Sequence, residues 1–196
     1  MSTRRRGPHR GRGRGAALLG IVLVLLGAPA AALDPAPGAA TVDGSPAEWT
    51  PADDVAAVVG NDPPFQERGR LSLRYDCDAE VLYALVMAAP DLRLQAVDPD
   101  EAYLRFGSDP KLVSGTDVPD GRAPDAAWVD RQGSTAAGIE LSTPLTPGRH
   151  DELRVHAKLP DDSADGYETL DLSPRYQGLE IVCGADPAVA LIGAPP

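Results

Sequence analysis

The chain has 196 residues, with 18 Lys and Arg against 29 Asp and Glu, for a formal net charge of −11. This length suits one domain or two small ones and is short for the large enzyme barrels of about 250 residues. Residues 1–32 hold six Arg and no acid, so the other 164 residues carry 12 basic and 29 acidic side chains, a formal charge of −17. Such a surface repels nucleic acids and anionic membranes, and we expect neither as a partner.

Residues 1–32 have the three parts of a secretory signal peptide. A basic segment at residues 1–15 precedes the apolar run AALLGIVLVLL at residues 16–26, and A-x-A cleavage sites end at Ala30 and Ala32. The run is shorter than the about 20 apolar residues that span a bilayer. We therefore expect a secreted, extracytoplasmic protein with no stable membrane span after processing; the alternative is an uncleaved anchor. The preference for Arg over Lys is typical of a GC-rich bacterial genome.

The rest of the chain is predicted as a linker, one domain and a tail. Residues 33–40 (LDPAPGAA) form the Pro/Ala linker, residues 41–183 the domain, and residues 184–196 a flexible tail rich in Ala, Pro and Gly. Gly and Pro recur throughout the domain, and Pro costs about 3 kcal/mol inside a helix. Only residues 53–59 are predicted as a short helix.

Between these breakers, apolar and polar residues alternate with period two, which predicts strands. The clearest pair is residues 71–77, alternating, and residues 81–87, apolar on both faces and therefore central, joined by a turn at 78–80. Alternation returns at residues 102–106, 139–141, 153–159 and 179–183, and more weakly at 126–129 and 168–172. About eight short strands joined by turns predict an all-β, two-sheet antiparallel β-sandwich of jelly-roll type.

The two cysteines predict a disulfide bond. Cys77 and Cys183 each close a stripe of inward-facing residues near the end of a predicted strand. In an oxidising compartment such a pair is expected to form a bridge. The alternative is two separate buried thiols.

The stretch TVDGSPAEW at residues 41–49 is the most informative motif. The Asp43-Gly44 turn is followed five residues after the glycine by Trp49, an aromatic that fills core space. With Glu48, these residues resemble the opening of extracytoplasmic sandwich domains related to DOMON and the family 9 carbohydrate-binding modules. The resemblance extends to most of residues 41–183 by strand pattern. It implies a jelly-roll-like sandwich, secretion and often sugar binding, sometimes with structural calcium, and it places the four residues in the fold-defining part of the motif.

A sugar site needs flat aromatic faces beside polar groups. Tyr103 and Arg105 alternate with the apolar face of their strand and are expected to point outward. Trp128 is the best candidate for a platform if it faces solvent near Tyr103; the alternative is that it belongs to the core. These three residues are our candidate ligand-binding residues.

Calcium is the other candidate ligand, since it takes six to eight oxygens. Acidic residues cluster in three predicted turns, at Asp76, Asp78 and Glu80, at Asp98, Asp100 and Glu101, and at Asp161, Asp162 and Asp165. The alternative is that these are solvated turns of an acidic protein.

The sequence favours a protein that is not an enzyme. It contains no nucleophile elbow, zinc helix, phosphate-binding loop or dinucleotide fingerprint. His150 lies in a predicted turn, and His156 lies between Arg154 and Lys158 in an outward basic stripe. We expect a secreted binding module for a glycan or another cell-envelope component. The alternative is a structural or adhesive envelope protein that binds other proteins without a small-ligand site.

Overall fold

The computed structural model describes residues 31–60, 66–97, 102–160, 166–172 and 176–184; the predicted signal peptide up to Ala30 and the tail beyond Gly184 lie outside these ranges. The described residues form β-strands and two short 3-10 helices, η1 (Pro46–Glu48) and η2 (Pro51–Asp53). Strand pairings are antiparallel, apart from β1 with β15 and β2 with β4. The predicted all-β antiparallel sandwich is confirmed.

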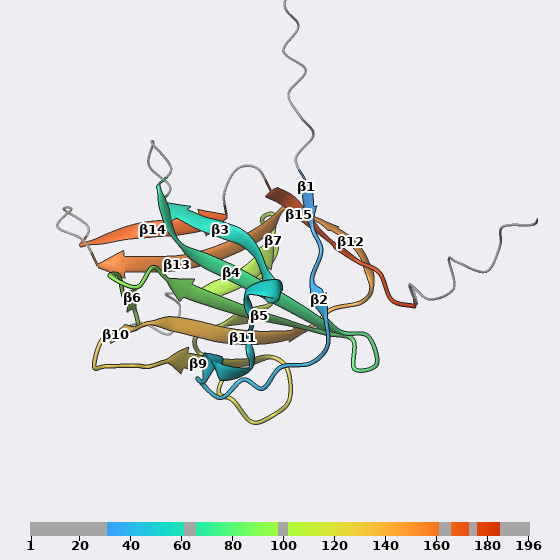
Figure 1. Ribbon diagram of the computed structural model, residues 1–196, viewed down its shortest axis with the longest axis horizontal. Helices are drawn as coiled ribbons and strands as arrows, with labels where there is room; N and C mark the ends of the chain where they lie inside the picture. Colours follow the sequence, from blue (N-terminus) through green and yellow to red (C-terminus); the bar gives the residue numbers. More distant parts are fainter. Residues whose placement is uncertain (1–30, 61–65, 98–101, 161–165, 173–175, 185–196) are drawn as a thin grey trace, which may run out of the picture.

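Nine strands follow one another in the largest sheet (Figure 1), and a tenth, β2 (Ala36–Pro37), pairs with β4 beside this path. Their order is β8 (Val113–Ser114), β7 (Tyr103–Phe106), β13 (Leu153–Pro160), β14 (Tyr167–Leu172), β3 (Asp54–Gly60), β4 (Glu67–Asp76), β5 (Val81–Ala88), β11 (Gly138–Pro144) and β9 (Asp125–Val129). A three-stranded sheet contains β1 (Ala31–Leu33), β15 (Tyr176–Ile181) and β12 (Gly148–Asp151), and a two-stranded one contains β10 (Thr135–Ala136) and β6 (Leu94–Gln95).

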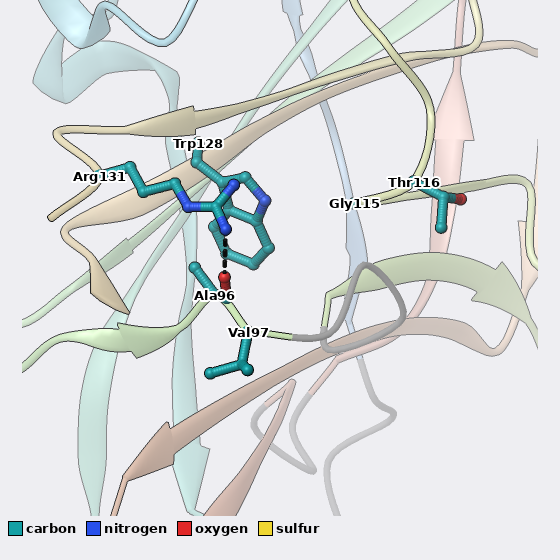
Figure 2. Close-up of a pocket in the computed structure, with 6 residues that line it drawn as sticks. All are labelled: Ala96, Val97, Gly115, Thr116, Trp128 and Arg131. Carbon is teal, nitrogen blue, oxygen red and sulfur yellow. Dashed lines mark hydrogen bonds between the residues drawn. The ribbon is translucent and has the colours of Figure 1, made fainter. Parts of the chain in front are cut away.

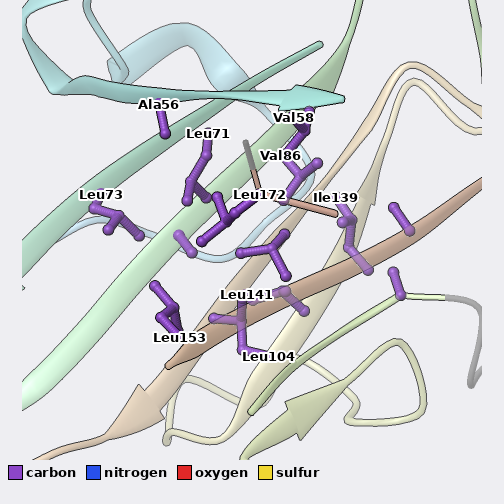
Figure 3. Packing of buried hydrophobic residues seen from close by; sticks show 14 of the residues in the cluster. Ala56, Val58, Leu71, Leu73, Val86, Leu104, Ile139, Leu141, Leu153 and Leu172 are labelled. Carbon is purple, nitrogen blue, oxygen red and sulfur yellow. The ribbon is translucent and has the colours of Figure 1, made fainter. Parts of the chain in front are cut away.

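The large sheet coils until its two ends approach each other. Beyond β8 the chain returns to β9, where the Ala126 amide donates to the Asp117 carbonyl at 3.0 Å. The Thr143 hydroxyl of β11 also lies 3.4 Å from the Leu112 carbonyl, just before β8. One half of the sheet therefore packs on the other, with the core between them. Figure 3 shows core side chains from both halves, among them Leu71, Val86, Ile139, Leu104 and Leu153.

The predicted strand pairs lie where their alternation places them. β4 and β5 form the expected hairpin, and β5 lies between β4 and β11, so its prediction as a central strand is confirmed. Inward-facing Leu71, Leu73 and Tyr75 of β4 are buried. The other predicted segments correspond to β7, β9, β11, β13, β14 and β15.

The predicted helix at residues 53–59 is wrong. Asp53 ends η2, and residues 54–60 form β3, which pairs with β14 on one side and β4 on the other. Val58 and Val59 are both buried, so both faces of this strand are covered. Burial on both faces removes the alternation that marks a strand, and the β-branched valines suit a sheet better than a helix.

Residues 33–40, predicted as a linker, instead contain the end of β1 and all of β2. Leu33 is 2% exposed and belongs to the core, and β1 pairs with β15. Ala36 and Pro37 form β2 beside Arg74 and Tyr75 of β4. The proline lies where it is tolerated, in a two-residue strand at the side of the sheet.

The predicted Cys77–Cys183 disulfide is present, with the two Cα atoms 5.7 Å apart. Cys77 is nevertheless exposed in the turn between β4 and β5 and is not the last inward residue of a strand. β4 ends at Asp76, whose carboxylate accepts the amides of Asp78 and Ala79 at 2.9 and 3.1 Å and so closes the turn. Cys183 follows β15 and packs against the core. The bridge thus joins the β4–β5 turn to the end of the small sheet.

Candidate functional site

The Asp43-Gly44 turn is held by a buried carboxylate that follows it in the chain by more than 90 residues. Glu140 of β11 is fully buried, and its Oε2 accepts the amides of Asp43 and Gly44 at 3.1 and 2.7 Å. Its Oε1 accepts the indole N–H of Trp49 at 2.9 Å. Burial raises the pKa of Glu140, whereas the donors from Trp49, Gly44 and Asp43 lower it. These hydrogen bonds tie the N-terminal segment to β11. Trp49, predicted to fill core space, is half-buried and acts as a hydrogen-bond donor.

Glycine is required in this turn for two reasons. Gly44 has a φ of +82°, in the left-handed region, and an added Cβ would lie 2.8 Å from the carbonyl oxygen of Trp128. The turn thus rests directly on β9. Glu48, the acidic member of the motif, is exposed, and its carboxylate accepts the Thr41 amide.

An ion pair between half-buried Arg74 and buried Asp53 also holds this segment. Arg74 of β4 donates from Nε and a terminal nitrogen to the two carboxylate oxygens of Asp53 at 3.0 and 2.8 Å. It also donates to the Glu48 carbonyl at 2.6 Å and lies with its Cζ 5.2 Å from the Trp49 ring centroid. The hydrogen bonds from Arg74 lower the pKa of Asp53 from 3.8 to about 2. Sequence reasoning missed Glu140 and Arg74, since they are far from the motif in the sequence. It also missed Asp53, although Thr50 and Asp53 have the spacing of a capping box.

Trp128 lines a pocket of about 300 Å³ beside the closure of the large sheet. It pairs with Ile139 and packs against the core, so it projects from the inward face of β9. The pocket wall consists of Ala96, Val97, Gly115, Thr116, Trp128 and Arg131. Figure 2 shows the Arg131 side chain reaching across to the Ala96 carbonyl, to which it donates at 2.8 Å.

Tyr103 and Arg105 point outward, as alternation predicts, because Leu104 between them faces the core. The Tyr103 ring stacks on that of His156 with centroids 4.5 Å apart, and the Arg105 Cζ lies 5.6 Å from the Tyr103 centroid. Tyr103 and Trp128 thus project from opposite faces of the coiled sheet. The structure does not bring them together as one platform, and neither Tyr103 nor Arg105 lines the pocket.

No calcium ligand set is apparent among the described residues: no group of three or more His, Cys, Asp or Glu side chains there could hold a metal ion. The carboxylate of Asp76 closes its own turn. The predicted clusters at residues 98–101 and 161–165 lie outside the described residues.

The two candidate histidines take part in packing. His150 lies with Nε2 2.8 Å from the Thr146 carbonyl, and its ring stacks on Phe106 at 5.1 Å. His156 stacks on Tyr103.

Comparison with protein-family models, with curated proteins and with solved structures finds no match to this chain. The resemblance of residues 41–49 to DOMON-like and family 9 carbohydrate-binding domains therefore stays a prediction. Across the described ranges, no helix has the length and apolar character needed to cross a membrane.

Proposed function

We propose that this chain is an extracytoplasmic, non-catalytic binding module whose ligand, a glycan or another cell-envelope component, occupies the Trp128 pocket. The observation that carries the proposal is a half-buried tryptophan in a pocket of about 300 Å³ that also presents the Arg131 guanidinium. An aromatic wall with a few polar groups is the usual composition of a ligand pocket, and this volume lies at the lower end of the usual range.

The pocket offers the two kinds of contact that a sugar ring needs. The indole of Trp128 provides an apolar surface for the C–H side of the ring. Arg131 and the exposed Thr116 provide polar groups for hydroxyls. The small volume favours one sugar residue, such as a chain end.

Two features of the chain support an extracytoplasmic location. The N-terminal 32 residues match the pattern of an export signal. The Cys77–Cys183 bridge is of the kind that persists in oxidising compartments. The motif at residues 41–49 supports a carbohydrate-binding role through its resemblance alone.

The test is an array of neutral glycans probed with the exported chain, with added calcium and with a chelator. We expect Trp128→Ala to weaken binding at least about tenfold, since the loss of an aromatic contact removes both buried area and ring-specific attraction. Arg131→Gln, which leaves the core intact, is expected to weaken binding as well. Tyr103→Ala, an aromatic on the opposite face, is the matched control and should bind as the parent does.

Two outcomes would contradict the proposal. One is the absence of glycan binding under either condition; the other is binding that Trp128→Ala and Arg131→Gln leave unchanged. Recovery of cross-linked protein partners together with the first outcome would support the alternative, a structural or adhesive envelope protein.

A further inference from the structure

The outward face of β7, β13 and the segment before β8 gathers positive charge on an otherwise acidic chain. Arg105, Arg154 and the chain's two lysines, Lys111 and Lys158, lie there, with the His156 ring among them. We call these five residues the cationic face. Its four fixed charges contrast with the net charge of −11 for the whole chain.

The register of the sheet brings two guanidinium groups together. Arg105 of β7 lies directly opposite Arg154 of β13. Like charges in opposed positions destabilise a sheet, so this pairing has a cost. Arg154 lies 3.4 Å from a carboxylate oxygen of Asp171, whereas the buried Nε of Arg105 has no hydrogen-bond partner in the part of the chain that the structure describes. Asp171 thus balances one of the two guanidinium charges, and an external anion would balance the other.

Tyrosine rings hold the cations in place. The Lys111 Nζ lies 4.6 Å from the Tyr103 centroid, and the Lys158 Nζ lies 4.1 Å from that of Tyr167. Such contacts fix long side chains and lower the entropy cost of binding. Because the Tyr103 ring is already stacked on His156, it offers no open platform for a nucleic-acid base. The cationic face is therefore suited to binding an anionic ligand through its charge.

We propose that the cationic face binds a linear polysaccharide that carries carboxylate groups, at a site separate from the Trp128 pocket. Arg154 and Lys158 lie on the same face of β13, four residues and so about 13 Å apart, and Arg105 lies directly opposite Arg154. A polymer with regularly spaced carboxylates can thus engage several cations at once, with the paired arginines as bidentate donors. The choice of a polysaccharide rests on the proposed function; the anion chemistry rests on the side chains alone.

The acidic remainder of the molecule does not prevent this binding. At 0.1 M salt the Debye length is about 10 Å, so carboxylates farther away than this are largely screened. Contacts between a bound anion and the residues of the cationic face are shorter than this length, so they determine the affinity for the anion. Binding should accordingly weaken as salt is raised further.

The experiment measures binding of the exported chain to polygalacturonate, with fully methyl-esterified polygalacturonate as the neutral control. We expect binding to the acidic polymer only, and a loss of about tenfold in Arg105→Gln/Arg154→Gln, as expected for the loss of charge-assisted hydrogen bonds. Lys111→Gln/Lys158→Gln should also weaken binding to the acidic polymer. This second variant provides an independent test if the arginine variant folds poorly. The matched control is Arg122→Gln/Arg149→Gln, which removes the same charge from exposed arginines elsewhere.

The inference would be overturned if the esterified polymer bound equally well, or if all three double variants bound the acidic polymer alike. Equal or tighter binding of polyglutamate or single-stranded DNA would assign the face to another class of polymer and overturn it too. Trp128→Ala should leave polygalacturonate binding intact, so failure here and failure of the pocket proposal are distinguishable.

Discussion

At Glu140, the cost of burying a carboxylate is offset by three converging donors. Two are backbone amides of the Asp43-Gly44 turn and the third is the indole N–H of Trp49. All three lie more than 90 residues away in the sequence. A charged acceptor strengthens each bond, because hydrogen bonds to ionised groups are about twice as strong as neutral ones. Glu140 thus links the first turn of the domain to β11, the strand next to the β9 end of the large sheet.

Replacing this carboxylate by its neutral isostere tests the link. In Glu140→Gln the amide group can accept on one side only, so its NH2 faces either the indole N–H or the two backbone amides, with donor against donor. We expect the free energy of unfolding to fall by about 1–3 kcal/mol, the cost of an unsatisfied buried polar group. The measurement is urea unfolding at neutral pH. The control is Glu180→Gln, the same change at an exposed position, whose free energy of unfolding should lie within about 0.5 kcal/mol of the parent value. Equal free energies of unfolding in the two variants would refute the role of Glu140.

Asp53 gives the fold a dependence on acid pH. Its pKa is about 2 in the folded protein against 3.8 as the ordinary value, because Arg74 donates to it. A lowered pKa means that the stabilisation is complete above pH about 4 and is lost as pH falls toward about 2. The shift corresponds to about 2 kcal/mol. The measurement is urea unfolding at about pH 5 and at about pH 2. The parent chain should show this loss of stability, and Asp53→Asn should lack it. The control is Asp78→Asn, in an exposed turn, which should behave as the parent does.

At the level of elements, alternation identified the longer strands that have one polar face, whereas β12, four residues of mostly polar character, was predicted as a turn. β4 and β13 alternate clearly, so their inward faces could be predicted from the sequence. The bounds of β13 were nearly right, whereas β4 begins four residues before the predicted segment, at Glu67, and ends at Asp76, one residue before its predicted end. β3 was missed because both of its faces are covered, and β1 and β2 were missed because strands of two or three residues have no measurable period. Likewise, Asp43 to Trp49 could be recognised as a motif, whereas its acceptor Glu140 could not, since only the register of β11 brings it there.

The same reasoning applies to the pocket. Trp128 could be identified as a candidate from its residue type, but its inward orientation follows from the pairing with Ile139. Its neighbours Arg131 and Thr116 follow β9 and β8, and they meet only because the large sheet nearly closes. Closure depends on the whole sheet, so no local sequence pattern predicts it.

Strand β1 leads to a prediction about where the proposed signal peptide would be cleaved, if the chain is exported. The sequence offers cleavage after Ala30 or after Ala32, and β1 pairs with β15 over Ala31 to Leu33. Cleavage after Ala32 would place a charged amino terminus on Leu33, which is 2% exposed. A buried charge without a partner is costly, so we expect Ala31 to be the first residue of the exported chain. Intact mass measurement of that chain decides between the sites: a chain that begins at Leu33 contradicts the prediction.

At the scale of the whole molecule, the two proposed binding surfaces are connected through one short strand. β8 pairs with β7, which carries Tyr103 and Arg105 on its outer side. Directly after β8, Gly115 and Thr116 line the Trp128 pocket. The place where the sheet closes therefore lies next to both surfaces, and the stability of that closure bears on both.

The Cys77–Cys183 bridge holds the molecule together over a still larger distance, because it closes a segment of 106 residues and ties the small β1–β15–β12 sheet to the β4–β5 turn. For a loop of this length the chain-entropy model gives about 4–5 kcal/mol, most of it from restriction of the unfolded chain. Cys77→Ser/Cys183→Ser should therefore lower the free energy of unfolding by up to that amount while the β-rich circular dichroism spectrum persists, since the core does not depend on the sulfur atoms. A reductant should produce the same loss in the parent chain and none in the double variant. An unchanged urea midpoint in the double variant would mean that the bridge does not restrict the unfolded chain.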